Sequence, residues 1–200
     1  MWRKSGVCSL AIGGGEPMLH PDIVRITREA KWLGYYVAVT TNGTMQKRVC
    51  ADRVHISFDE IHMTDYEKIR QSLRFFKSFV SKVGVNHIVT NLKSLKRALQ
   101  LPADTFTLLM EKPESSFNDW EKAFAQVPKH KLWIDACLAV KLGIRKTCKQ
   151  GITSMSLNAK YEASKCSNIK EKVPYHISLE ETFEKVKHQK CPLNFLNKPV

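Results

Sequence analysis

The chain has 200 residues, of which 43% are hydrophobic and 9% aromatic, a content typical of one domain with a buried core or of such a domain with a small appendage. No apolar run approaches the length of a membrane span and Met1-Trp2-Arg3-Lys4 shows no signal-peptide pattern, so we expect a soluble, cytoplasmic protein with no membrane partner. The formal net charge of +13 is compatible with a nucleic-acid partner, although the sequence contains no motif of a known nucleic-acid-binding module.

Apolar and amphipathic segments alternate through the first two thirds of the chain. Runs of apolar, β-branched and aromatic residues predict strands, and apolar residues spaced for one helix face predict helices. In chain order the predicted elements are strand 7–12, helix 21–33, strand 35–41, strand 54–58, helix 64–82, strand 85–90, helix 92–99, strand 106–110, helix 117–124 and strand 132–134. This alternation predicts βαβ units and a parallel sheet. We expect the first strand to be covered on both faces, with Cys8 as a small core residue.

Polar residues follow the carboxyl ends of the first three predicted strands. These strands open into Gly13-Gly14-Gly15-Glu16-Pro17, Thr41-Asn42-Gly43 and Ser57-Phe58-Asp59-Glu60. Three consecutive glycines leave the backbone bare where something must approach it closely, and Pro17 stiffens the turn that presents Glu16. Ligands of parallel α/β sheets bind outside the carboxyl ends of the strands. We therefore expect the functional site at this edge.

The order of these motifs resembles the radical S-adenosylmethionine (radical SAM) superfamily. A glycine pair alone would indicate only a tight turn. Here, however, segment 12–21 resembles the family's loop for the methionine end of SAM, and segments 34–44 and 54–59 resemble its next two strands. The resemblance covers roughly residues 6–112. It implies an α/β fold, namely a partial (β/α)6 barrel of the radical SAM type that lacks its first strand, followed by a small cysteine-bearing C-terminal extension.

The resemblance also implies a cofactor site. Glu16 would bind the amino group of SAM through a charge-assisted hydrogen bond. The remaining implied SAM-binding residues are Gly14, Gly15, Pro17, Asn42, Ser57 and Asp59. Asn-Gly is above all a turn signal and a strand-end aspartate also caps helices, so the roles of Asn42 and Asp59 stay open. His55 is interpreted as a structural residue.

Beyond residue 134 the alternation stops, and we place a domain boundary there: residues 1–134 form the partial barrel and residues 135–200 an extension. The extension holds four of the six cysteines, Cys137, Cys148, Cys166 and Cys191. Its segment 148–167 resembles the auxiliary-cluster extensions of radical SAM enzymes (SPASM or twitch), although Tyr161 stands where the family usually has a hairpin glycine. Four thiolates are the number that one iron–sulfur cluster needs. A structural zinc site and unliganded thiols are the alternatives.

The family's C-x3-C-x2-C signature, which binds the [4Fe–4S] cluster that reduces SAM, does not occur in this sequence. We interpret the chain as a fragment or as a degenerate relative, expect it to be inactive in radical chemistry by itself, and leave its catalytic residues unknown. In the full-length parent the resemblance implies SAM-dependent and iron–sulfur-dependent radical chemistry, with a peptide or protein as the expected substrate. The alternative is a degenerate, non-enzymatic SAM-binding or RNA-binding protein.

Overall fold

The computed structural model describes residues 5–61, 65–112, 115–150, 152–175 and 178–193. They divide into two compact units, one formed by Val7–Asp135 and the other by the described residues from Ala136 onward with Ser5 and Gly6. The predicted helix start at Thr64 and Gly151 of the C-terminal motif lie outside the described residues. None of the helices in the described ranges is both long enough and apolar enough to span a bilayer.

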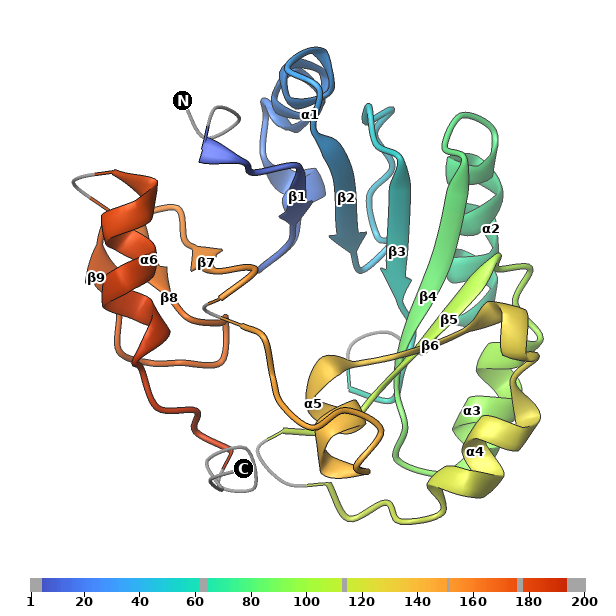
Figure 1. Cartoon of the computed structure of the whole chain (residues 1–200). Coiled ribbons are helices and arrows are strands. Elements are labelled where there is room, and N and C mark those ends of the chain that lie inside the picture. The colour runs from blue at the N-terminus through green and yellow to red at the C-terminus, as the bar shows by residue number, and fades with distance from the viewer. Residues whose placement is uncertain (1–4, 62–64, 113–114, 151, 176–177, 194–200) are drawn as a thin grey trace. The chain divides into compact units, whose positions relative to one another are not determined.

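The larger unit is built on six parallel strands that follow one another in sequential order (Figure 1). They are β1 (Ser9–Ile12), β2 (Tyr36–Thr41), β3 (Arg53–Ser57), β4 (Lys82–Ile88), β5 (Thr105–Leu109) and β6 (Leu132–Ile134). Among the described residues β1 and β6 do not pair with each other, so the sheet is open. The predicted α/β fold with a parallel sheet is confirmed.

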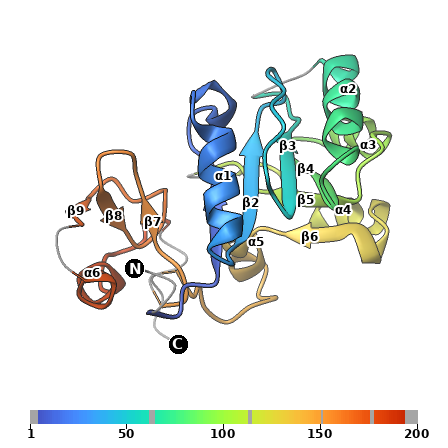
Figure 2. The same ribbon diagram turned by 90° about the horizontal axis from the view of Figure 1, so that it is seen from above.

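Four helices lie along one face of this sheet: α1 (Ile23–Trp32), α2 (Tyr66–Lys77), α3 (Leu92–Leu99) and α4 (Trp120–Gln126) (Figures 1 and 2). Right-handed crossovers between sequentially ordered parallel strands bring every helix to the same face. The apolar core therefore lies between the sheet and the helices, where Ile56, Val85, Leu73 and Phe76 are fully buried. Two short 3-10 helices, η2 (Pro17–Leu19) and η3 (Lys129–Lys131), complete this unit.

The boundary between α2 and β4 differs from the prediction. The sequence predicts a helix to residue 82 and a strand from residue 85, with Gly84 ending the helix. In the structure α2 ends at Lys77 and β4 begins at Lys82. Gly84 lies inside β4, where a Cβ atom would stand 2.4 Å from Oγ1 of Thr105 in β5. Glycine at this position does not end a helix. It lets the side chain of Thr105 approach the backbone of β4 closely.

The first strand lies at one end of the described sheet. β1 pairs with β2 alone, and its four residues alternate between exposed and half-buried. Cys8, directly before it, is exposed. The predictions of a strand covered on both faces and of a buried Cys8 are therefore wrong. An apolar run indicates a strand but does not say how many neighbours the strand has.

The smaller unit contains the helices α5 (Ala136–Lys141) and α6 (Leu179–Lys187) and an antiparallel sheet of β7 (Ser156–Leu157), β8 (Glu162–Ser164) and β9 (Val173–Pro174). Tyr161, between β7 and β8, has a φ of 58° and is the one non-glycine residue with positive φ among the described residues. This is the position at which the family resemblance leads one to expect glycine. The left-handed backbone explains that expectation, because it is strained for residues with a Cβ atom.

Candidate functional site

The loop after β1 is closed by the carboxylate of Glu16, which caps the N-terminus of η2. Oε1 of Glu16 accepts hydrogen bonds from the backbone N–H of Met18 at 2.9 Å and from the hydroxyl of Thr41 at 2.7 Å. Its Oε2 accepts a hydrogen bond from the backbone N–H of Asn42 at 2.6 Å. The carboxylate thereby fastens the glycine loop of β1 to the end of β2.

The same carboxylate has room for one more donor. An ionised carboxylate offers about four acceptor positions, and three of those of Glu16 are occupied, which leaves one on Oε2. Gly14 and Gly15 beside it are exposed and have φ angles of 76° and 47°. A Cβ atom built on either glycine would meet no atom within 4 Å other than those of the adjacent residues in the chain. The open space along this backbone and the available acceptor fit a ligand that carries an ammonium group.

Asn42, Ser57 and Asp59 lie at the same edge of the sheet as Glu16, because β1, β2 and β3 are parallel neighbours and each residue follows or ends its strand. Oδ1 of Asn42 accepts hydrogen bonds from the N–H and the hydroxyl of Thr44, so its side chain forms a local turn. Asp59 is buried, and its carboxylate accepts a hydrogen bond from a backbone N–H of the same loop. The structure brings the expected residues to one edge, and their role in SAM binding stays a prediction.

A second group of contacts joins the ends of β3 and β4. Glu60 accepts hydrogen bonds from the hydroxyl of Thr90 at 2.6 Å and from the amide of Asn91 at 3.2 Å, and these bonds lower the pKa of Glu60. His87 is fully buried in β4 and hydrogen-bonds the backbone carbonyl of Phe58. Burial lowers the pKa of His87, so its ring is neutral near pH 7. These contacts order the loop that contains Asp59 and Glu60.

Sequence reasoning missed that the sheet face opposite the helices is polar. Arg53, His55 and Ser57 of β3 point to this face and alternate with buried apolar residues. The guanidinium of Arg53 lies over the ring of Trp133, 4.2 Å from its centroid. Nδ1 of His55 is 2.7 Å from Oδ1 of Asn86 in β4. The period-two alternation of polar residues in β3 is the sequence signal that could have revealed this face.

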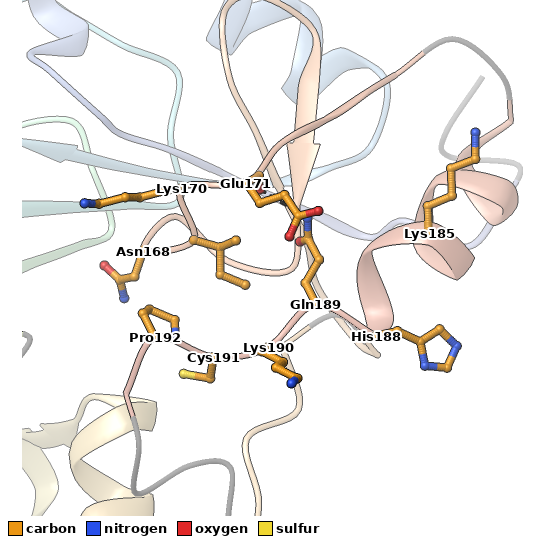
Figure 3. A pocket seen from close by; sticks show the side chains of 10 residues that line it. Asn168, Lys170, Glu171, Lys185, His188, Gln189, Lys190, Cys191 and Pro192 are labelled. Carbon is orange, nitrogen blue, oxygen red and sulfur yellow. Dashed lines mark hydrogen bonds between the residues drawn. The ribbon is translucent and has the colours of Figure 1, made fainter.

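The four cysteines expected to bind a cluster, Cys137, Cys148, Cys166 and Cys191, are all half-buried. Burial raises the pKa of Cys191, and the thiols of Cys166 and Cys148 raise it further. Cys191 also lines a pocket of about 660 Å³ in the smaller unit (Figure 3). Within the described ranges, no three His, Cys, Asp or Glu side chains are arranged to hold a metal ion. The thiols do not form a ready metal site as they stand, and the cluster assignment stays a prediction.

No family model matches the chain. Over 75 residues it is 39% identical to a probable GTP 3',8-cyclase of Saccharolobus solfataricus, a match that covers 34% of this chain and 24% of the cyclase. Over 104 residues it is 31% identical to a probable GTP 3',8-cyclase of Methanothermobacter thermautotrophicus, covering 46% of this chain and 34% of that protein. The matched segments span about a quarter to a third of the length of these relatives.

Among solved structures, the chain is similar to SuiB of Streptococcus suis. SuiB bound to S-adenosylmethionine matches with a TM-score of 0.66 and 14% identity over 92% of this chain and 55% of SuiB. SuiB bound to its precursor peptide SuiA matches with a TM-score of 0.67 and 13% identity over 88% and 53%. At this identity the likeness shows a shared fold. The related cyclases and this fold support the resemblance to the radical SAM superfamily that the order of the strand-end motifs indicates.

Proposed function

We propose that the larger unit binds S-adenosylmethionine at the carboxyl ends of β1, β2 and β3. The observation that carries the proposal is the carboxylate of Glu16, which is held by three hydrogen bonds and keeps one acceptor position beside the exposed backbone of Gly14 and Gly15. The ammonium group of the methionine moiety would fill that position with a charge-assisted hydrogen bond. Further proposed SAM contacts come from Pro17, Asn42, Ser57 and Asp59.

Together with a [4Fe–4S] cluster, SAM supplies the radical chemistry that defines the superfamily. The residues of this chain contribute binding and orientation. Thr41 and Asn42 hold Glu16 in place, so the carboxylate does not have to be ordered when the ligand arrives. For the smaller unit we propose that Cys137, Cys148, Cys166 and Cys191 bind one auxiliary iron–sulfur cluster.

For the substrate we propose a peptide. Support comes from SuiB, which shares the fold of this chain and has been crystallised with its precursor peptide SuiA. A purine nucleotide is the second candidate, and the sequence identity to probable GTP 3',8-cyclases favours it. Titration of GTP against the chain in the presence of SAM tests this alternative, since saturable GTP binding would favour the nucleotide.

Equilibrium dialysis of the whole chain against labelled SAM tests the cofactor proposal. We expect Glu16→Gln to weaken SAM binding by about tenfold or more, because it removes the charge and the acceptor on Oε2. Thr41→Val is the matched control: it removes one hydrogen bond to Glu16 but keeps the carboxylate. We expect it to lower the thermal midpoint while SAM binding changes much less.

The outcomes separate ligand binding from fold. If Glu16→Gln binds SAM as the wild type does, Glu16 is only a link between β1 and β2. If Thr41→Val loses affinity as strongly as Glu16→Gln, the effect reports loop order and not a contact with the ligand. If the wild-type chain itself binds no SAM, the proposed function of this unit is wrong.

A further inference from the structure

One row of side chains on the polar face of the sheet has hydrogen-bonding groups that the fold does not use. In register, Ser57 of β3 lies beside Asn86 of β4, which lies beside Thr107 of β5. All three are half-buried, and Ser57 is the last residue of its strand, so the row lies toward the carboxyl edge. Within the described residues, the amide nitrogen of Asn86 and the hydroxyl of Ser57 have no hydrogen-bond partner, and neither atom is sealed from the surface.

His55 fixes the orientation of the Asn86 amide. Nδ1 of His55 lies 2.7 Å from Oδ1 of Asn86, and an amide oxygen can only accept, so Nδ1 carries the proton. Nε2 of His55 is buried without a partner in the described part of the chain. With the proton on Nδ1, Nε2 carries only an unpaired acceptor lone pair. A buried acceptor without a partner is tolerated better than a buried N–H group without one.

The opposite arrangement is unfavourable for the same reason. Turning the Asn86 amide over would place an NH2 group against Nδ1 of His55 and move the ring proton to Nε2. That proton would then be a buried donor without an acceptor, which is unfavourable because the N–H loses its hydrogen bond to water and gains no other. Burial also lowers the pKa of His55, so the ring stays neutral near pH 7 and holds a single proton. The oxygen of Asn86 therefore faces His55, and the NH2 group is left to donate to something else.

We propose that the row Ser57–Asn86–Thr107 recognises a hydrogen-bond acceptor of a small molecule bound at the carboxyl edge, with Asn86 as the donor and His55 as the residue that positions it. The acceptor is a carbonyl oxygen or an unprotonated ring nitrogen, because an uncharged amide donor pairs with either. This inference rests on the proposed function, since it extends the site from the ends of β1, β2 and β3 to β4 and β5. SAM and guanine nucleotides both carry such acceptors, so both serve as probes.

The test uses Asn86→Asp in the whole chain. Aspartate keeps the shape and an acceptor for Nδ1 of His55 but has no NH2 group to donate. We expect its affinity for SAM or for GTP to fall by about tenfold or more, while the urea midpoint stays close to that of the wild type. Asn118→Asp, at an exposed position before α4, adds the same charge and should leave both affinities unchanged. His55→Phe should weaken the same probe by a smaller factor, because Asn86 is then free to turn.

Nitrogen NMR of the His55 ring gives a readout that a merely structural role would not move. We expect the proton on Nδ1 in the wild type, and a proton on Nε2 would overturn the argument for the Asn86 orientation. Wild-type affinities for both probes in Asn86→Asp would overturn the recognition role while leaving the SAM proposal intact. If the wild type binds GTP but not SAM, the cofactor proposal fails. The affinity of Asn86→Asp for GTP then decides whether the row recognises a ligand. If it binds neither, both proposals fail.

Discussion

Two histidines in the sheet of the larger unit, the buried His87 and the half-buried His55, make its stability depend on pH. Burial is the largest influence on both rings and lowers the pKa of His55 and of His87 below the ordinary value of 6.5. The nearby Arg53 lowers the pKa of His55 further, whereas its hydrogen bond to Asn86 opposes the shift. For His87, the hydrogen bond to the carbonyl of Phe58 and the charges of Asp59 and Glu60 oppose it. Both rings are therefore held neutral by the fold.

The unfolded chain takes up protons on these histidines near pH 6.5, and the folded chain does so only at lower pH. The free energy of unfolding is thus highest above pH 6.5 and falls as the pH drops through 6.5 toward the folded pKa values. Urea midpoints at about pH 7.5 and 5.5 measure the effect. His55→Asn should reduce the difference between the two midpoints, whereas His130→Asn, at an exposed position, should not. Equal differences in all three proteins would contradict the prediction.

Residues at strand ends were easier to anticipate from sequence than residues within strands. Glu16 follows a glycine run in a strand–loop–helix pattern, so its neighbourhood is local and visible in the sequence. The hydrogen bond that it accepts from Thr41 joins residues that are 25 positions apart. His55 and Asn86 are 31 positions apart, and their pairing depends on the register of β3 against β4. A single sequence contains the alternation of β3 but not that register.

At the level of elements, the approach of β4 to β5 depends on the missing side chain of Gly84. A Cβ atom there would lie 2.4 Å from Oγ1 and 3.2 Å from the carbonyl oxygen of Thr105, and 3.4 Å from the ring of His55. The hydroxyl of Thr105 is itself buried without a hydrogen-bond partner among the described residues. Glycine in β4 therefore makes room for side chains of both adjacent strands.

Gly84→Ala should destabilise the larger unit by about 1–3 kcal/mol, because the new methyl group overlaps Thr105. The double variant Gly84→Ala with Thr105→Ala should recover most of this loss, since it removes Oγ1, and Thr105→Ala alone should have a small effect. Urea unfolding of the three variants and the wild type forms a double-mutant cycle. Simple additivity of the two single effects would show that the contact does not limit the spacing of β4 and β5.

The element order followed from the sequence, and several boundaries did not. The strands β1 to β6 lie within two or three residues of the predicted segments, because each is a compact apolar run between turn signals. The sequence predicts the end of α2 five residues beyond Lys77, because a glycine such as Gly84 can either end a helix or lie within a strand. The sequence does not reveal the edge position of β1, because the number of strands that pair with it depends on the topology of the whole sheet.

At the scale of the whole molecule, the two units are held together internally by different means. The larger unit has a continuous apolar core between its sheet and helices. In the described part of the smaller unit there are two short helices, α5 and α6, and three strands of two or three residues, which is little regular structure for that many residues. Segments of this kind are commonly stabilised by a metal or a cluster. Its half-buried cysteines are the side chains available for that role.

Anaerobic reconstitution of the whole chain with iron and sulfide tests the cluster proposal. We expect a brown protein with broad visible absorption and a higher thermal midpoint for the smaller unit, because ligands that bind only the folded state stabilise it. Cys148 and Cys166 lie close enough to Cys191 to raise the pKa of its thiol, so we expect these three to share the cluster. Cys148→Ser should abolish the colour, and Cys8→Ser, at an exposed position in the larger part of the chain, should leave it unchanged.

A parallel measurement of zinc binding distinguishes an iron–sulfur cluster from a simple metal site. Thiolates bind both iron–sulfur clusters and tetrahedral zinc, so a colourless protein that takes up one zinc ion through Cys148 and Cys166 would replace the cluster with a structural metal. A protein that stays colourless, binds no zinc and keeps the same thermal midpoint after Cys148→Ser would contradict both. The SAM proposal would stand in that case, because it depends on Glu16 and the glycine loop of the larger unit alone.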